Sequence, residues 1–452
     1  MIGASARFYS RISIERSQHV IASTVLIEVF SIQFHQTVTF NYNYISDDIV
    51  CISDAKNVFI EKCVILVLRY LKGSLNFDEF SHRMENIRCE GKLRVALCAD
   101  NDFYSQIDLL KSKGLPLVSE SLKTIARFHP CPIDATGKVV VSKTGMGSSA
   151  ALTTSLVGAF LQYFNAVDLS IESEEDKLIV HNLSQLVHAI GTYTVILYSF
   201  MLNLVITAQG KIGSGFDVAS AVYGSLIYRR FHAEGLNGLD EKVAPSVIRA
   251  SVVNTEIWNQ SITTFTLPPP LSLMMGDVCG GSSSVSMAKA VLEWRRKPNS
   301  MNTWNALAEC NSQICTAFQE LESWHKRDGK WYHQSIDAMM LVEKDDWVKD
   351  PLMKRLLEIK QLFRKARKLL KLIGEEAGVE IEPNSQTVLS NSTDDIPGVL
   401  CAGVPGAGGV DAIFCIVHVK ARNAVESLWS QWSHTTVCPL LLVADDRGVR
   451  LE

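Results

Sequence analysis

The sequence predicts a mixed α/β protein with two domains, and three observations support this fold class. Its 452 residues exceed the size of one ordinary hydrophobic core. Strand-like and helix-like patterns mix along the whole chain. The run Pro268-Pro269-Pro270 is the clearest break in the middle of the chain, so we expect one domain over residues 1–275 and a second over residues 276–452.

Apolar patterning predicts the individual elements. Alternating or continuous apolar runs predict β-strands at residues 24–30, 93–98 and 139–141. Apolar residues at helical spacing predict α-helices over residues 58–71, 148–164 and 352–373.

Composition excludes several classes of function. A net charge of -4 and an isoelectric point of about 6.3 give no electrostatic reason to expect nucleic-acid binding. The 11 cysteines include no C-x-x-C pair, which is typical of a reducing compartment and argues against structural zinc. His181 and His188 lie seven residues apart without further metal ligands, so we interpret them as residues on a helix face.

The ends of the chain bear on its location. The first residues lack the apolar core of a secretory signal. The terminal Arg450-Leu451-Glu452 is not a peroxisomal tripeptide. We therefore predict a cytosolic protein.

The segment KTGMGSSAALTTSL, residues 143–156, is typical of a phosphate-binding turn. Gly145 and Gly147 allow a ligand to approach the backbone closely, and the following serines fall in the first turn of the predicted helix. Free N–H groups give a helix start a partial positive charge, and a serine hydroxyl there can reach a phosphate oxygen or bound Mg²⁺. We favour a phosphate cradle over the alternative of a glycine turn with a serine cap.

A second glycine loop, GKIGSGFDVASAVYGSLIY at residues 210–228, contains both Lys211 and Asp217. An aspartate near an attacking group and a lysine near phosphates are the parts that phosphoryl transfer needs. Alternatively, Asp217 is the N-cap of a helix over residues 218–224 and Lys211 is a solvated charge. The residues alone leave these two interpretations open.

Three further segments give weaker signals. Residues 403–417, GVPGAGGVDAIFCIV, form a glycine loop before an apolar run, and residues 276–287, GDVCGGSSSVSM, contain a potential anion nest. The helix over residues 354–374 carries many basic side chains, most of which we expect to be solvated. P-loop and protein-kinase motifs are absent from the sequence.

Residues 190–208, IGTYTVILYSFMLNLVITA, contain no charge. By hydropathy they are nearly long enough to span a bilayer. However, no basic flank sets an orientation, and the rest of the chain has the character of a soluble protein. We therefore do not predict a membrane span here.

Taken together, these motifs resemble those of the phosphomevalonate kinases, which belong to the galactokinase, homoserine kinase, mevalonate kinase and phosphomevalonate kinase (GHMP) superfamily. KTGMGSSAA is similar to the second motif, GSGFDVASAVYG to the aspartate segment, GGSSSVSM to G-G-S-S-T-P-S-M, and GVPGAGGVDAIF to the third motif. The resemblance runs from about residue 90 to the end, and the ending LLLVADDRGVRLE is most similar to plant-type enzymes.

This resemblance implies a two-domain kinase fold with an S5-like first domain and a ferredoxin-like second domain. It implies ATP- and Mg²⁺-dependent phosphorylation of (R)-5-phosphomevalonate to (R)-5-diphosphomevalonate. By motif, the residues at the ATP phosphates would be Lys143, Gly145, Gly147, Ser148, Ser149 and Ala150, with Ser148 or Ser149 at the metal. Asp217 and Lys211 would face the phosphoryl acceptor. Further site-lining residues would be Ser214, Gly215, Ser282, Ser283, Gly406, Gly408, Gly409, Arg367 and Lys371.

The sequence departs from the family pattern in three places. It begins at a segment that resembles the one after the family's A-P-G-K loop, so the first motif is missing and we expect both stability and rate to be lowered. Residues 190–208 separate HNLSQLVHA from QGKIGSGFD, which the family joins directly, and we hypothesise that they are translated intron sequence. Val285 replaces a proline.

Two hypotheses for function follow. The first is a phosphomevalonate kinase whose activity is impaired by the missing motif. The second is a noncatalytic relative of the same fold that binds a nucleotide or metabolite.

Overall fold

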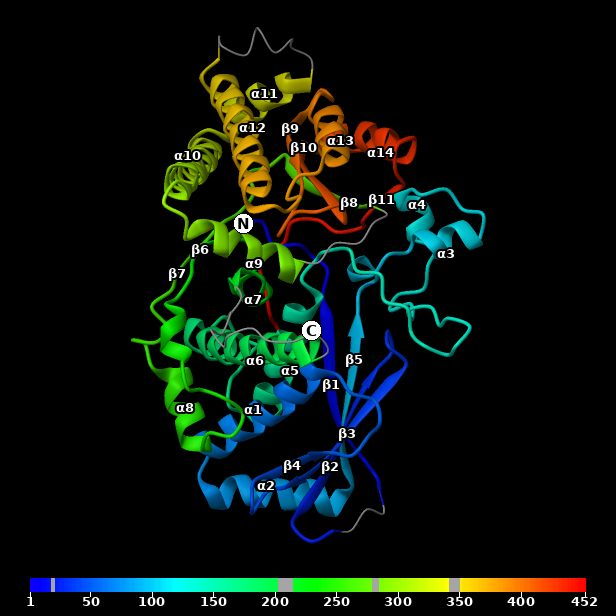
Figure 1. Ribbon diagram of the computed structural model, residues 1–452, viewed down its shortest axis with the longest axis vertical. Coiled ribbons are helices and arrows are strands. Elements are labelled where there is room, and N and C mark those ends of the chain that lie inside the picture. The colour runs from blue at the N-terminus through cyan, green and yellow to red at the C-terminus, as the bar shows by residue number, and fades with distance from the viewer. Residues whose placement is uncertain (18–20, 202–213, 279–283, 341–349) are drawn as a thin grey trace.

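The computed structural model describes residues 1–17, 21–201, 214–278, 284–340 and 350–452. These residues form two lobes stacked along the long axis of the molecule (Figure 1). One lobe contains the N-terminal sheet, and the other contains the sheet formed by the later strands.

The first lobe is built on a five-stranded sheet with the order β1-β5-β2-β3-β4. Its strands are β1 (Phe8–Glu15), β2 (Thr24–Ser31), β3 (Gln36–Asn43), β4 (Asp48–Cys51) and β5 (Lys92–Ala99). β2 and β5 are parallel, and the other neighbours are antiparallel. Fully buried Val25, Ile27 and Val29 alternate with half-buried residues along β2, so one face of the sheet carries the core.

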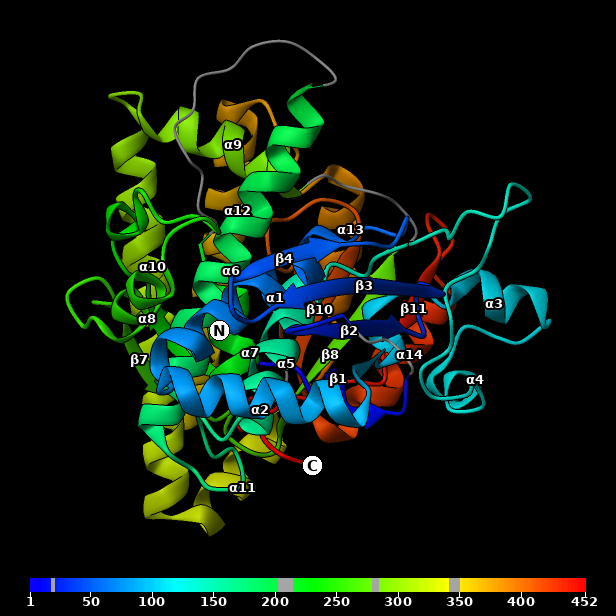
Figure 2. The ribbon, with the colours of Figure 1, turned by 90° about the horizontal axis from the view of Figure 1, so that it is seen from below.

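Helices pack against this sheet and against one another. The longer ones are α1 (Val58–Ser74), α2 (Phe77–Glu90), α5 (Ser148–Tyr163), α6 (Glu174–Met201), α7 (Phe216–Tyr223) and α8 (Pro245–Val253). α2 contacts β1, β2 and β5, and Figure 2 shows it beside these strands. α5, α6 and α7 contact one another. Smaller elements are α3 (Ile107–Ser112), α4 (Ser119–Leu122) and the hairpin of β6 (Leu226–Arg229) with β7 (Ser261–Thr264).

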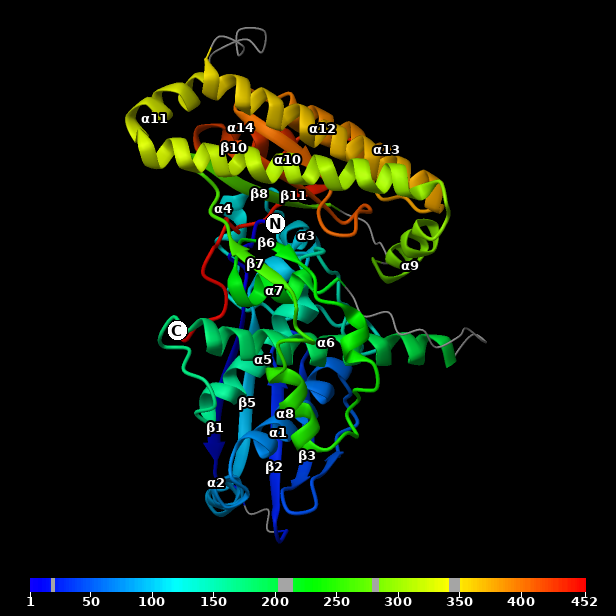
Figure 3. The same cartoon turned by 90° about the vertical axis from the view of Figure 1, so that its left-hand side faces the viewer.

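The second lobe contains an antiparallel sheet with the order β11-β8-β10-β9. Its strands are β8 (Leu271–Val278), β9 (Val399–Gly403), β10 (Ala412–His418) and β11 (Val437–Pro439). Its helices are α9 (Ser284–Arg295), α10 (Ser300–Arg327), α11 (Gly329–Asp337), α12 (Pro351–Ala377), α13 (Asn384–Asp394) and α14 (Arg422–Ser430). Figure 3 shows α10 and α12 running side by side across this lobe.

Both faces of the second sheet are covered. Ile413 and Val417 of β10 belong to a cluster with Val425 and Trp429 of α14. Ile416, which points to the opposite face, belongs to the cluster formed with α10, α11 and α12. This burial on both sides explains why every residue of β9 is buried.

Most of the predicted elements are confirmed. The predicted helices 58–71, 148–164 and 352–373 correspond to α1, α5 and α12, and the predicted strands 24–30 and 93–98 correspond to β2 and β5. The predicted strand 139–141 is wrong. Val140 and Val141 are exposed, and Val139 forms an isolated bridge with Ile133, because in the part of the chain that the structure describes no strand of a sheet pairs with this apolar run. The chain therefore enters α5 from an extended loop.

Residue 275 lies inside β8, which begins directly after the proline run. β8 pairs with β10 from Leu271 to Asp277, so a boundary at residue 275 would divide a continuous ladder of hydrogen bonds. We propose that residues 268–270 separate the two lobes. The peptide bond between Pro269 and Pro270 is cis.

Residues 440–452, here called the C-terminal strap, return to the first lobe (Figure 3). Asp445 O accepts a hydrogen bond of 2.9 Å from Ser225 N, and Val449 N donates one of 3.0 Å to Val222 O. Residues 276–452 therefore do not pack as a single unit, because the last of them form hydrogen bonds with residues of the first lobe in and just after α7.

The apolar segment 190–208 is described only in part. Its residues 190–201 continue α6 beyond the helical turn that contains His188, and residues 202–208 lie outside the described part of the chain. Within the described ranges, none of the helices has the length and apolar character that crossing a bilayer requires.

The lobes also meet through a buried carboxyl group at the end of β8. Ser105 of the first lobe donates a hydrogen bond to Asp277, a residue that is only 4% exposed. Burial raises the pKa of Asp277 to about 6, the hydrogen bond from Ser105 opposes the shift, and the charges of Asp411 and Asp108 add to it.

We expect Asp277 to make the stability of the fold depend on pH. In the unfolded chain this carboxyl group loses its proton near pH 4, but in the folded protein it keeps the proton up to a pH of about 6. The folded state therefore binds more protons in this window, and the free energy of unfolding falls as the pH rises through it. Asp277→Asn should gain stability relative to the wild type from pH 4 to pH 7, by up to about 3 kcal/mol.

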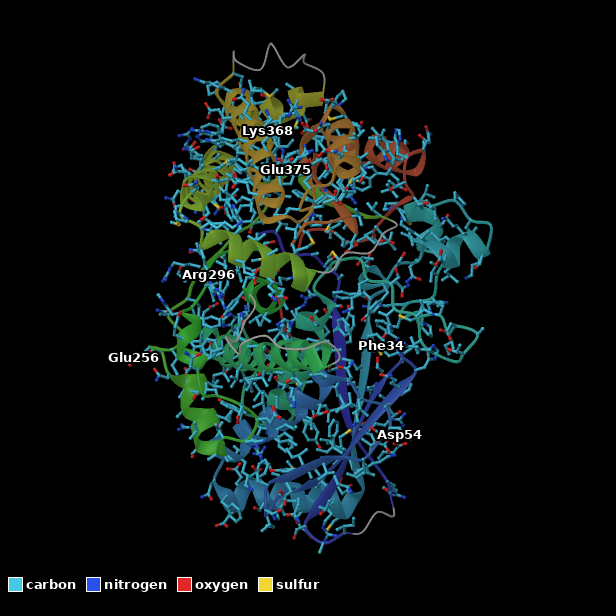
Figure 4. All side chains as sticks on the ribbon, in the orientation of Figure 1. Phe34, Asp54, Glu256, Arg296, Lys368 and Glu375 are labelled. Atoms are coloured by element: carbon cyan, nitrogen blue, oxygen red, sulfur yellow. The ribbon has the colours of Figure 1, made fainter. Side chains whose placement is uncertain are left out.

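Chemical denaturation of the two proteins at a series of pH values measures this difference. Asp54→Asn, at an exposed position of the first lobe (Figure 4), controls for the loss of a carboxylate as such. A difference between Asp277→Asn and the wild type that stays constant from pH 4 to pH 7 would contradict the prediction.

Candidate functional site

Two helices of the first lobe begin in the same unusual way. The N-cap of α5 is Gly147 with φ 68°, and the N-cap of α7 is Gly215 with φ 74°, both in the left-handed region that glycine adopts readily. Neither helix start has a side-chain cap. The serine cap considered for α5 and the Asp217 cap considered for α7 are therefore both wrong, because the glycines take those positions.

The two helix starts lie against each other. A side-chain carbon added to Gly147 would stand 3.4 Å from Cβ of Asp217, which is in the first turn of α7. Asp217 accepts a hydrogen bond of 2.9 Å from the N–H of Val218. Its carboxylate thus lies beside the partial positive charge at the start of α5.

A histidine from α6 connects these two turns. Nε2 of His188 lies 3.0 Å from Oγ of Ser149 and 4.0 Å from Oδ2 of Asp217. The His188 ring is stacked on Phe59 of α1, with 5.3 Å between ring centroids. Three helices therefore contribute polar groups to one place.

The electrostatics of this place depend on burial. Burial lowers the pKa of His188, the charge of Asp217 opposes that shift, and the charge of Lys143 adds to it. Burial also lowers the pKa of Lys143, although part of its side chain is open to solvent. No ion pair involves Lys143 in the ranges that the structure describes. An anion bound here would compensate a partly desolvated cation.

The two serines of the motif face different neighbours. Burial raises the pKa of Tyr104, and a hydrogen bond with the buried Ser148 opposes that shift. Ser149 faces His188 instead. Ser148 thus belongs to the inner wall of the first turn, whereas Ser149 belongs to the cluster with Asp217.

A buried amide fixes the start of α7. Nε2 of Gln185 donates a hydrogen bond of 2.6 Å to Gly215 O and lies 3.2 Å from Nε2 of His181. Burial lowers the pKa of His181 to about 4, so this imidazole is neutral near pH 7. Reasoning from the sequence missed Gln185 and the role of His188. The seven-residue spacing of the two histidines was the one available signal.

Part of the glycine loop of the second lobe has a packing explanation. Gly406, Gly408 and Gly409 all have positive φ, at 64°, 87° and 100°. Gly409 N donates a hydrogen bond of 2.9 Å to Ile381 O, and a side-chain carbon on Gly408 would stand 2.3 Å from the same oxygen. The backbone contact with Ile381 therefore accounts for at least one of these glycines without a ligand.

The basic residues singled out on α12 have partners within the second lobe. Arg367 forms two hydrogen bonds with the buried carboxylate of Glu382, at 2.6 and 3.1 Å, so it is not a solvated charge. Lys371 donates to Asn384 Oδ1 at 2.7 Å and to Thr387 Oγ1 at 3.2 Å. Figure 4 labels two other charged residues along this helix, Lys368 and Glu375.

Several predicted site residues cannot be placed. Lys211, Ser282 and Ser283 lie outside the described residues. Ser214 is exposed directly before Gly215. The structure thus brings together the α5 motif and Asp217, but it does not describe the lysine of the second loop.

The donors present would suit Mg²⁺. Within the described residues, no three His, Cys, Asp or Glu side chains gather as a metal cage. The first turns of α5 and α7 offer hydroxyl groups and the carboxylate of Asp217. Mg²⁺ is commonly bound by one or two carboxylates together with substrate phosphates and water, so this donor set fits that ion.

The fold is shared with solved structures of other proteins, one of which is a kinase of a small molecule. The fold is similar to a structure of the Lin0012 protein of Listeria innocua, with TM-score 0.53 and 13% identity over 98% of this chain and 92% of that one. It is also similar to the phosphomevalonate kinase of Streptococcus pneumoniae, with TM-score 0.51 and 14% identity over 98% and 92% of the two chains. These likenesses concern the fold alone.

Similarity at the sequence level identifies the family. No family model matches the chain. The chain is 34% identical to the peroxisomal phosphomevalonate kinase of Arabidopsis thaliana over 435 residues, which cover 91% of this chain and 81% of that protein. It is 31% identical to the phosphomevalonate kinase of Gibberella zeae, over 88% of this chain and 76% of that one. The chain therefore belongs to the phosphomevalonate kinase family.

We expect Gly215→Ala to destabilise the protein more than Gly238→Ala. Both glycines have positive φ, at 74° and 80°, so alanine strains the backbone at each position; the cost of that strain is roughly 1 kcal/mol. A carbon added at Gly238 has nothing within 4 Å, but at Gly215 it would stand 2.5 Å from Gln185 Oε1. Moving this buried amide breaks its hydrogen bond and should cost about 1–3 kcal/mol more.

Urea denaturation of both variants measures the difference. Gly238→Ala is the matched control, because it introduces the same side chain at nearly the same φ in open space. Equal losses of stability in the two variants would show that Gln185 does not hold Gly215 as described.

Proposed function

We propose that this chain transfers the γ-phosphoryl group of ATP to the phosphate of (R)-5-phosphomevalonate, giving (R)-5-diphosphomevalonate and ADP. The observation that carries this proposal is the close approach of Gly147 and Asp217 at two glycine-capped helix starts. One start offers N–H groups for phosphates, and the other offers a carboxylate next to them. Membership of the phosphomevalonate kinase family supports the choice of substrate.

In this proposal the ATP phosphates would lie at the start of α5. A side-chain carbon at Gly145 would have nothing within 4 Å, so there is open space in front of this turn. Backbone N–H groups of the first turn would point at the phosphates, and the ammonium group of Lys143 would add charge. Mg²⁺, when bound, neutralises charge on the β- and γ-phosphates.

The acceptor is a phosphate and not an alcohol, which changes what Asp217 has to do. An oxygen of the 5-phosphate forms the new bond to the γ-phosphorus while the bond from γ-phosphorus to the β,γ-bridging oxygen breaks, and ADP leaves with the electron pair. A phosphate monoester has its second pKa near about 6, so most of the acceptor is already a dianion at pH 7. Asp217 therefore mainly orients the groups around it and takes a proton only from the monoanion.

The second lobe is proposed to supply the remaining contacts. Lys371 donates hydrogen bonds to the neutral side chains of Asn384 and Thr387, so it is better suited to bind a substrate phosphate than Arg367, which already holds Glu382. The roles of Lys211, Ser282 and Ser283 remain predictions from the motifs. Location in the cytosol is likewise a prediction, and the Arabidopsis relative is named peroxisomal.

A coupled assay of ADP release with (R)-5-phosphomevalonate tests the activity. Turnover that depends on this substrate supports the proposal. Absence of turnover together with retained binding of Mg-ATP would instead identify a noncatalytic nucleotide-binding relative.

We expect Asp217→Asn to lower kcat by about 100-fold or more. The amide keeps the size of the side chain but loses the charge that organises the acceptor and the metal. The affinity for ATP should change by less than about threefold, because the N–H groups of α5 are untouched. Steady-state kinetics and calorimetric titration with Mg-ATP measure the two quantities.

The matched control is Asp78→Asn, which removes an exposed carboxylate from the first turn of α2, a helix that contributes no residue to the candidate site. It should retain wild-type kinetics. If Asp217→Asn were as active as this control, Asp217 would have no part in the reaction.

A further inference from the structure

We propose that His188 is a positioning residue, which holds the Ser149 hydroxyl and the Asp217 carboxylate in fixed relation across the site. This inference rests on the proposed kinase function. Its basis is a single ring nitrogen, Nε2, that lies 3.0 Å from Ser149 Oγ and 4.0 Å from Asp217 Oδ2. Ser149 and Asp217 come from helix starts that are far apart in sequence, so a third group that touches both sets their separation.

The ring of His188 is itself held firmly. It is stacked on Phe59, with an interplanar angle of 22°, and its side chain is 13% exposed. Phe59 also packs closely on the next turn of α6, because a side-chain carbon at Gly191 would stand 2.9 Å from its ring. The stacking leaves the imidazole little freedom to rotate about its own axis, so the direction of Nε2 is set by packing.

His188 belongs to a stripe of α6 that faces the start of α7. His181, Gln185 and His188 are spaced by four and three residues, which places them on one helix face. Gln185 holds Gly215 O, and His188 reaches the carboxylate two residues further on. The same face of α6 therefore fixes both the backbone and the functional side chain of the α7 turn.

The contact with His188 also orients the hydroxyl of Ser149. When Nε2 accepts the hydroxyl proton, the lone pairs of Oγ are directed away from the ring and toward the space in front of α5. When Nε2 carries the proton, it donates to Oγ and the oxygen stays at the same place. Either way the position of Ser149 Oγ is determined by His188, while Ser148 is occupied at Tyr104.

The test is a double-mutant cycle with four variants. His188→Phe keeps a ring on Phe59 but removes Nε2, His188→Gln places an amide nitrogen near the position of Nε2, and Ser149→Ala removes the hydroxyl. The fourth variant combines Ser149→Ala with His188→Phe. Each is assayed for kcat and for KM toward ATP and (R)-5-phosphomevalonate, and circular dichroism and thermal unfolding check the fold.

If His188 acts by positioning, His188→Phe should lower kcat by roughly 10- to 100-fold with KM values changed less than about threefold. His188→Gln should recover most of the loss. The double variant should be no slower than the slower of the two single variants, because both remove the same contact. Losses that multiply in the double variant, or a His188→Gln variant as slow as His188→Phe, would overturn the proposal.

Two other outcomes, a His188→Phe variant that does not fold and a wild type without turnover, call for different comparisons. If His188→Phe fails to fold, the comparison is made between His188→Gln and His188→Asn, since the shorter amide cannot reach the Nε2 position; equal kcat values would count against positioning. If the wild type binds Mg-ATP but shows no turnover, the catalytic proposal fails separately. The same cycle is then measured as affinity for Mg-ATP, where non-additive losses support the role of His188 and additive losses exclude it.

Discussion

The site depends on the close approach of two helix starts, each of which begins at a glycine with positive φ. A side-chain carbon at Gly147 would stand 3.4 Å from Cβ of Asp217, in ordinary van der Waals contact, so the left-handed φ of 68° is what favours glycine at this position. Both starts expose backbone N–H groups and carry partial positive charge, so bringing them together is electrostatically unfavourable by itself. The carboxylate of Asp217 lies between them and compensates part of that charge. A bound polyphosphate would compensate more of this positive charge. The exposed backbone N–H groups at the two helix starts are therefore suited to bind such an anion.

The remainder of the first lobe holds this arrangement in place. α6 runs past both starts and fixes one through Gln185 and the other through His188, while Phe59 of α1 supports the histidine from behind. The C-terminal strap adds hydrogen bonds from the opposite end of the sequence next to α7, through Ser225. Such a site is rigid because its polar groups are carried by packed helices and not by loop tips.

Local patterns predicted the helices α1, α5 and α12 and the strands β2 and β5, and they located the glycine turns before α5 and α7, because glycine placement and apolar spacing are properties of short segments. They failed at 139–141, where an apolar run has no strand to pair with and Val140 remains exposed. They also failed to identify His188 as part of the site. Its helical face was visible from the spacing to His181, but what that face meets is decided by tertiary packing. Arg367 shows the same limit of reasoning from local patterns. We expected most basic side chains of its helix to be solvated, but its guanidinium group is bound to the buried Glu382.

The apolar residues 190–208 are compatible with this site because of where the contacts of α6 lie. Gln185 and His188, which contact the start of α7, both precede the apolar segment, and the described chain resumes at residue 214, directly before Gly215. The residues that precede and follow this part of the chain are thus held next to each other by the contacts of Gln185 and His188 with the start of α7. Additional residues between these fixed ends therefore need not displace Asp217 from the start of α5, whatever the origin of the segment.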